Sequence, residues 1–279
     1  MTKSPKTRVA PVGTLARGMR STMRNWWYIG PLGWIVMPSR MPPQGGLLKY
    51  PIARHVVTVR LRDGWTLRCR VNEIFAVAEV FAVGTYDRPN IHWSEARTIL
   101  DIGANVGAAT LWMARRAPNA RIVAVEPSPQ ALELLRDNVR RNGLENRVTV
   151  VAGGVGRAAG ITHIALDGVS VSGRTSENET GAEVQVYTLD DVAKVAGTNG
   201  VDVIKIDCEG AEYDAFAGAS PELLRNVEAV VGEYHAVPGH DRGELTELLR
   251  PAGFEVTLKG DSDLGSLTAL RPSAQPAQR

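Results

Sequence analysis

Short apolar runs alternate with amphipathic segments along most of the chain from Thr98 onward. Runs of about five apolar residues between turn residues are typical of buried strands, and apolar positions three and four apart are typical of helices. This pattern predicts seven strands, at residues 98–102, 121–126, 148–152, 201–207, 228–234, 254–259 and 266–271. Strands that alternate with helices form a mostly parallel sheet with helices on both faces. The predicted fold class is therefore α/β.

Two helices can be recognised in the sequence, one from the residues at its ends and one from its apolar stripe. Ser128 is placed to cap one, Pro129 occupies its first turn, and Gly143 ends it. An earlier helical segment is predicted at about residues 73–81, with its apolar side chains on one face. The pattern weakens between residues 153 and 188, and the polar stretch Ser170 to Gly181 predicts an irregular excursion.

The alternating stretch 55–71 predicts a β-hairpin, and its register follows from the side chains. A two-residue turn would place Arg60 opposite Leu67 and mix polar and apolar residues on each face. A three-residue loop that ends in a left-handed Gly64 places Val59 opposite Leu67 and keeps one face apolar. We predict this second register. Its pairs are Val57 with Cys69, Val59 with Leu67 and Leu61 with Trp65.

Charge is distributed unevenly, although the net charge is only +2. Residues 1–62 carry 11 Lys/Arg and no Asp/Glu, whereas residues 63–279 carry 21 Lys/Arg and 30 Asp/Glu. Three of the six Trp lie in the apolar run Trp26 to Met37. We expect this run to dock on the protein's own body; a homo-oligomer contact or a peripheral membrane contact is the alternative. The predicted parts are a basic, Trp-rich arm (1–54), a hairpin and helix leading into the core (55–97), the main domain (98–271) and a tail (272–279).

Composition excludes several classes of protein. A chain with 44% hydrophobic and 22% charged residues is globular rather than disordered or fibrous. The run Trp26 to Met37 is interrupted by Gly and Pro and is too short to span a bilayer. Two cysteines cannot build a disulfide framework, so we expect a cytoplasmic protein.

The stretch ILDIGANVG (99–107) carries the first candidate chemistry. A strand leads into Asp101, and Gly103, Asn105 and Gly107 form a turn that opens a helix, where backbone amides can approach a ligand. The next strand ends in Glu126, an acid suited to the two hydroxyls of a ribose. The spacing is neither G-x-G-x-x-G nor a P-loop, so S-adenosylmethionine (SAM) is favoured over NAD, FAD or a nucleoside triphosphate. The alternative for Asp101 is that it only caps the following helix.

The second candidate group lies in two later strands. In VIKIDCEGAE (203–212), Lys205, Asp207 and Glu209 share parity, and in AVVGEYH, Glu233 and His235 do the same. If the two strands are neighbours, all five side chains line one cleft at the carboxyl end of the sheet, where open α/β sheets bind ligands. The alternatives are that Lys205 simply pairs with Asp207 or Glu233, or that the group holds a divalent metal ion.

These stretches also resemble a known family. The segments LRDG, NEIFAVAEVFAVGTYD, ILDIGANVG, VAVEPSPQALELLRDNVRRNG, YTLDDV, IKIDCEGAE and VVGEYH occur in the same order as in the FkbM family of SAM-dependent methyltransferases. The resemblance covers about residues 54–271. It implies a Rossmann-like class I fold with strand order 3-2-1-4-5-7-6, and methyl transfer from SAM to a hydroxyl of a sugar, glycoside or polyketide-type small molecule.

The resemblance also implies roles for particular residues. Asp101, Gly103, Asn105 and Gly107 match the motif that contacts the amino-acid end of SAM, Glu126 matches the ribose acid, and Asp207 and Glu209 match the acidic reaction-site motif. With their neighbours, the predicted cofactor-binding residues are Asp101, Gly103, Ala104, Asn105, Gly107, Glu126, Pro127, Gly153 and Gly154. With the side chains that share their parity, the predicted reaction-site residues are Lys205, Asp207, Glu209, Glu233 and His235. We expect His235 or Asp207 to accept the hydroxyl proton, Glu209 and Glu233 to orient the acceptor, and Lys205 to tune the acids. No acid follows the third strand, so backbone groups there would contact the adenine. No metal is predicted.

Three other functions are alternatives to this one. A nucleic-acid methyltransferase fits the basic arm, but the chain has neither an N-P-P-Y motif nor a Pro-Cys nucleophile. A SAM-binding adaptor without activity would not need the acidic group, and a nicotinamide oxidoreductase is the third alternative. We therefore expect a small-molecule acceptor and no nucleic-acid partner. The arm is then a lid or an acceptor-side element that favours an anionic or membrane-borne acceptor.

Overall fold

A computed structural model describes residues 54–61, 64–164, 182–197 and 200–272. The predicted arm, including Trp26 to Met37, lies outside these residues, and so does nearly all of the tail. The segment 55–97 contributes to the same hydrophobic core as the main domain, through residues such as Leu67 and Val77. In the described part of the chain, no helix is long and apolar enough to cross a membrane.

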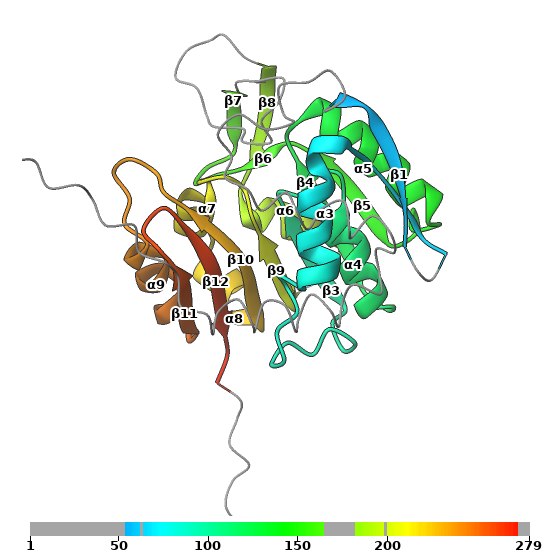
Figure 1. Ribbon diagram of the computed structural model, residues 1–279. Coiled ribbons are helices and arrows are strands. Elements are labelled where there is room, and N and C mark those ends of the chain that lie inside the picture. Colours follow the sequence, from blue (N-terminus) through cyan, green and yellow to red (C-terminus); the bar gives the residue numbers. More distant parts are fainter. Residues whose placement is uncertain (1–53, 62–63, 165–181, 198–199, 273–279) are drawn as a thin grey trace, which may run out of the picture.

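A seven-stranded sheet forms the centre of the molecule (Figure 1). Its strands are β3 (Thr98–Ile102), β4 (Arg121–Glu126), β5 (Val148–Ala152), β9 (Val203–Ile206), β10 (Ala229–His235), β11 (Glu255–Gly260) and β12 (Leu264–Leu270). Each lies within two residues of its predicted bounds. The spatial order is β11-β12-β10-β9-β3-β4-β5, with β12 antiparallel to both of its neighbours. This is the predicted order 3-2-1-4-5-7-6, read from the other edge, so the fold prediction is confirmed.

Helices cover both faces of this sheet (Figure 1). The main ones are α4 (Ala108–Arg116), α5 (Pro129–Arg141), α6 (Leu189–Val195), α7 (Glu212–Gly218), α8 (Pro221–Asn226) and α9 (Gly243–Leu249). Successive residues of β3 point to opposite faces, so Ile99 joins the core beneath α4 and α5 while Leu100 joins the core beneath α6 to α9. The predicted ends of α5 are confirmed. The Ser128 hydroxyl accepts a hydrogen bond from the Ala131 N–H at the first end, and Gly143, with a φ of 65°, follows the last turn.

The hairpin is formed by β1 (Val56–Arg60) and β2 (Thr66–Arg70) in the predicted register. Val59 lies opposite Leu67, both are buried, and Gly64 has a φ of 84°. The predicted helix that follows is composite. A turn of 3-10 helix (Val71–Glu73) leads into α3 (Ile74–Ala78), which continues as a π-helix (Glu79–Val83).

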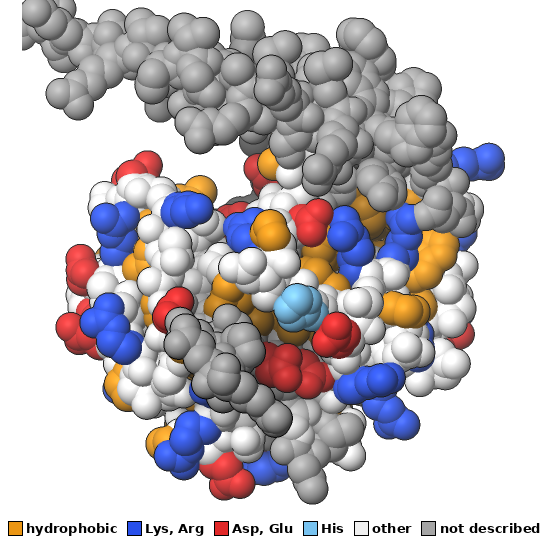
Figure 2. All heavy atoms as spheres, turned by 90° about the horizontal axis from the view of Figure 1, so that it is seen from below, with side chains coloured by type: hydrophobic (Ala, Val, Ile, Leu, Met, Phe, Trp, Pro, Cys, Tyr) orange, Lys and Arg blue, Asp and Glu red, His pale blue; other side chains and the backbone are white. Residues whose placement is uncertain are grey.

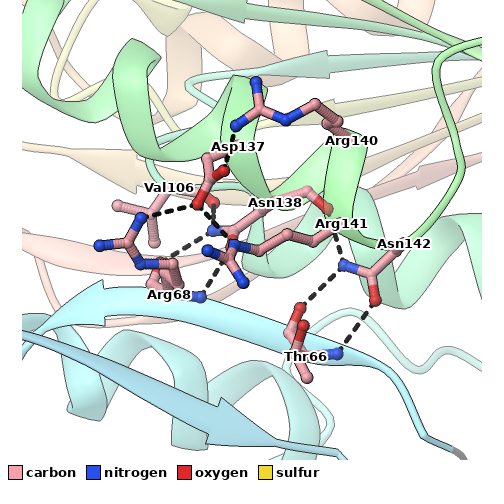
Figure 3. A network of polar contacts seen from close by, with 8 residues as sticks. All are labelled: Thr66, Arg68, Val106, Asp137, Asn138, Arg140, Arg141 and Asn142. Atoms are coloured by element: carbon pink, nitrogen blue, oxygen red, sulfur yellow. Dashed lines mark hydrogen bonds and ion pairs between the residues drawn. The ribbon is translucent and has the colours of Figure 1, made fainter.

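Side chains of α5 hold the hairpin on the domain (Figure 3). The Asn138 amide accepts from the Arg68 N–H (2.6 Å) and donates to the Arg68 carbonyl (2.8 Å), and Asn142 does the same with Thr66 (3.0 and 2.8 Å). The Arg68 guanidinium forms an ion pair with Asp137 (2.8 Å). Burial would raise the pKa of Asp137, but its bonds to arginines, Arg68 among them, lower it to about 2. The amides therefore complete the hydrogen bonding of the β2 edge.

The weak region of the sequence contains a second small sheet that the pattern did not predict. It consists of β6 (Gly154–Val155), β7 (Gly160–Ile164) and β8 (Ala182–Tyr187), in the order β6-β8-β7. In Figure 1 it lies above the carboxyl ends of the central strands. The predicted excursion, residues 170–181, lies outside the described residues. β6 has only two residues, and a long polar stretch separates β7 from β8, so the pattern gives no clear signal for this sheet.

The opposite side of the molecule, at the amino ends of the central strands, is seen from below in Figure 2. Basic and acidic side chains lie next to one another on this face, between small apolar areas. The described residues of this face therefore carry charges of both signs, although the start of the sequence is basic and the rest is acidic.

Candidate active site

The turn after β3 is shaped by close backbone contact. Gly103 has a φ of 72°, and a Cβ there would lie 1.8 Å from the carbonyl oxygen of Asp207, so only glycine fits. Asn105 also has a positive φ, of 49°, and Gly107 starts α4 with a φ of 89°. The turn thus brings the end of β3 directly against the segment that follows β9.

Glu126, at the end of β4, supports this turn. One carboxylate oxygen accepts from the Asn105 N–H (2.7 Å) and the other from the Ser128 N–H (2.8 Å). The side chain is buried, and burial raises the pKa of Glu126 to about 6 in spite of these two bonds. It also lines the cavity described below, so its remaining lone pairs fit the hydroxyls of a ribose.

Asp101 and Lys205 form a buried pair beneath the turn. They are opposite each other on β3 and β9, and Lys205 Nζ lies 3.2 Å from Asp101 Oδ1. Asp101 also accepts from the Thr110 hydroxyl (2.5 Å), and Lys205 donates to the Gly103 carbonyl (2.8 Å). Lys205 thus pairs with Asp101, a partner that sequence analysis did not consider, rather than with Asp207 or Glu233.

A cavity of about 500 Å³ opens at the carboxyl ends of the central strands. It brings together most of the predicted residues, namely Gly103, Ala104, Asn105, Glu126, Pro127, Gly153, Gly154, Lys205, Asp207, Glu209, Glu233 and His235. Asp101 and Gly107 do not line it. The β9 and β10 strands are neighbours, as the prediction required, although β9 ends at Ile206 and leaves Asp207 and Glu209 in the loop beyond it.

The small sheet contributes apolar side chains to the lining of the cavity. Val155, Ile164, Val184 and Val186 line it beside Gly153. An apolar wall next to the ribose-type acid Glu126 suits a flat aromatic base such as adenine. The turn, the acid and this wall therefore fit an adenosine cofactor with the chemistry of SAM.

His235 is held by a carboxylate that sequence analysis missed. Its Nδ1 lies 2.9 Å from Oε1 of the fully buried Glu212, and its Nε2 lies 3.9 Å from Asp207 Oδ1 and 3.7 Å from Glu209 Oε2. Burial would lower the pKa of His235, but the bond to Glu212 and the surrounding charges outweigh burial and raise it to about 9. A histidine that already carries this proton is a poor proton acceptor at neutral pH. Of the two predicted bases, the raised pKa of His235 therefore favours Asp207.

Glu233 lies deeper in the same group. Burial, reinforced by the charges of Asp207 and Glu79, raises the pKa of Glu233 to about 7. Among the described residues, one group of three could hold a metal ion, since Asp207, Glu233 and His235 each offer a ligand atom within 4.8 Å of the others. The same three groups can equally share protons with a bound hydroxyl.

Tyr86 is the second functional residue that sequence analysis missed. Its hydroxyl donates to Asp207 Oδ2 (2.9 Å), although the two residues are 121 positions apart. Tyr86 is the second-last residue of NEIFAVAEVFAVGTYD, one of the stretches that carried the resemblance. That stretch was the only signal, and nothing in it indicated a contact with the acids.

Comparisons with known proteins agree with this geometry. The profile of the Methyltransferase FkbM domain family matches residues 101–256. Over 242 residues the chain is 28% identical to 31-O-demethyl-FK506 methyltransferase FkbM of Streptomyces tacrolimicus, covering 74% of this chain and 92% of that protein. It is 27% identical to Methyltransferase sdnD of Sordaria araneosa, and the match covers 67% of this chain and 84% of that protein. The crystal structure of Methyltransferase FkbM from Methylobacillus flagellatus aligns at 17% identity with a TM-score of 0.45, covering 71% of this chain and 54% of that one.

The family profile spans more than half of the chain and includes the turn, Glu126 and the acidic group. The cavity gathers these same elements at the carboxyl ends of β3, β4, β9 and β10. The protein therefore belongs to the FkbM family and is a SAM-dependent methyltransferase.

Proposed function

We propose that this protein transfers the methyl group of SAM to a hydroxyl of a small molecule, either a sugar or glycoside or a polyketide-type natural product. The observation that carries this proposal is the shared cavity, in which the cofactor turn at Gly103 touches the backbone of Asp207. A carboxylate next to the cofactor site suits an acceptor that must lose a proton. A relative named 31-O-demethyl-FK506 methyltransferase points to the same kind of acceptor.

SAM supplies an activated methyl group on a positively charged sulfur. The protein must then align the acceptor for in-line displacement, which is chiefly a matter of positioning. A bond forms between the acceptor oxygen and the methyl carbon, the bond from carbon to sulfur breaks, and the hydroxyl proton passes to Asp207. His235 holds its proton toward Asp207 and Glu209, while Glu209 and Glu233 orient the acceptor.

α3 and β12 each contribute an exposed apolar side chain to the lining of this cavity. Phe75 and Leu264 line it and are 40% and 49% exposed. Apolar side chains at the rim suit an acceptor whose hydroxyl is carried on an apolar body. We propose a cytoplasmic enzyme with a small-molecule partner and no nucleic-acid partner.

Transfer from labelled SAM to a panel of glycosides, polyketide alcohols and lipids, with RNA as the negative control, tests the proposal. Asp207→Asn, Glu209→Gln and His235→Ala should each slow single-turnover transfer to the best acceptor. Rates close to wild type in all three variants would refute the site. Label in RNA alone would replace the small-molecule acceptor by a nucleic acid.

A further inference from the structure

Tyr86 lies at the centre of the site, although it comes from the segment that precedes the family domain. It is 4% exposed and lines the cavity. Its hydroxyl donates to Oδ2 of Asp207 (2.9 Å), and Lys205 Nζ lies 5.4 Å from the centre of its ring. One side chain therefore contacts both the buried cation and the carboxylate next to it.

The hydrogen bond from Tyr86 gives the two carboxylate oxygens of Asp207 different surroundings. Oδ2 is occupied by the phenol, whereas Oδ1 faces His235 Nε2 at 3.9 Å. Burial, together with the charges of Asp207 and Glu233, raises the pKa of Tyr86 well above its ordinary value. The phenol therefore stays protonated and acts toward Asp207 only as a donor.

The turn that carries Tyr86 is held at both ends. The π-helix ends at Val83, and the N–H groups of Gly84 and Thr85 that follow it both donate to the Glu79 carbonyl (3.0 and 3.2 Å). On the other side, Asp87 forms an ion pair with Arg116 of α4 (3.1 Å). A side chain on a turn fixed in this way can orient its partner at little cost in entropy.

We propose that Tyr86 is a positioning residue of the methyl-transfer site, which holds the Asp207 carboxylate so that its Oδ1 faces the acceptor hydroxyl. This inference rests on the proposed function. It makes the segment before the family domain part of the reaction site.

Tyr86→Phe removes the hydroxyl and keeps the ring over Lys205. With the best acceptor from the labelled-SAM panel, kcat should fall about tenfold or more, because a hydrogen bond to a charged group is lost. KM for SAM and the Kd of S-adenosylhomocysteine should stay within about twofold. Tyr234→Phe is the matched control, since Tyr234 is fully buried and donates to the Asp261 carbonyl (2.8 Å) away from the cavity. Its kcat should stay within about twofold of wild type.

A double-mutant cycle separates positioning from general damage. In the Asp207→Asn background, adding Tyr86→Phe should change the rate less than about twofold, because the hydroxyl acts through the carboxylate. The proposal would be overturned if Tyr86→Phe lowered the rate equally in the wild-type and Asp207→Asn backgrounds, or if kcat were unchanged in Tyr86→Phe alone.

A crystal structure of Tyr86→Phe gives a readout that needs no acceptor. We expect the Asp207 carboxylate to rotate or to take more than one orientation, while the turn at Gly103 stays in place. An unchanged Asp207 would overturn the positioning role, whatever the activity. If instead wild-type protein methylates no hydroxyl in the panel, the proposed function fails, and the structure of the variant still decides whether Tyr86 positions Asp207.

Discussion

Lys205 and Asp101 face each other on adjacent strands, with 3.2 Å between Nζ and Oδ1 and with both side chains almost completely buried. Lys205 also donates to the carbonyls of Ile102 and Gly103, where β3 passes into the cofactor turn. The pair thus joins β9 to the turn from below. A buried pair of this kind is costly to break on one side only, because the remaining charge has no partner.

Lys205→Met should therefore lower the free energy of unfolding by about 3 kcal/mol or more, since it leaves Asp101 buried without its cation. Urea unfolding measures this loss. Lys194→Met is the control, because Lys194 pairs with Asp191 at the surface (3.0 Å) and its removal should cost about 0.5 kcal/mol or less. A Lys205→Met variant within 1 kcal/mol of wild type, roughly the cost of an exposed pair, would contradict the importance of the buried pair.

Glu212→Gln should lower the pKa of His235 from about 9 toward its ordinary value of 6.5, because the bond to Glu212 is the main influence that raises it. A raised histidine pKa stabilises the fold fully below about pH 6.5, and this contribution disappears as the pH rises through about 9. The stability difference between wild type and variant should narrow over that interval. Titration of the imidazole signals by NMR measures the pKa itself.

Glu244→Gln is the control for this titration. Glu244 bonds His240 in the same way (2.9 Å) at a more exposed site, so the His235 titration should not move. If the pKa of His235 is unchanged in Glu212→Gln, the other carboxylates alone hold the proton of this histidine.

Methyl transfer should not require a divalent metal. A metal at His235 Nε2 would have to displace the proton that this histidine holds up to about pH 9. After treatment with EDTA and gel filtration, the rate of methyl transfer should stay within about twofold of the rate of the untreated enzyme. Loss of activity that Mg²⁺ or Mn²⁺ restores would assign Asp207, Glu233 and His235 as ligands instead.

Deletion of residues 1–50 should leave cofactor binding intact and impair turnover. The turn at Gly103 is supported by Glu126, which accepts from the N–H groups of Asn105 and Ser128, and all four residues belong to the described part of the chain. Calorimetry with S-adenosylhomocysteine should give the same Kd as the full chain, whereas kcat should fall at least tenfold if the arm covers the acceptor. Equal turnover on the same acceptor would remove the arm from the site.

Local pattern was enough to predict the central sheet and the hairpin. The strands of the sheet are apolar on both faces and the hairpin on one, so their bounds and register follow from the positions of Val59, Leu67 and similar residues. The small sheet was missed, because β6 has only two residues and β7 and β8 lie on either side of a long polar stretch. Parity also predicted that Glu233 and His235 share a cavity with Lys205.

The sequence by itself determined the fold, the family and most of the groups at the carboxyl ends of the strands, but not Glu212 or Tyr86. Tertiary structure decided how those groups are paired: Lys205 with Asp101, His235 with Glu212, and Asp207 with Tyr86. Parity along a strand states which side a residue faces, but not which residue of another element meets it there. That depends on how strands and loops far apart in the chain pack together, and under the proposed function this pairing leaves Oδ1 of Asp207 to take the proton of the acceptor.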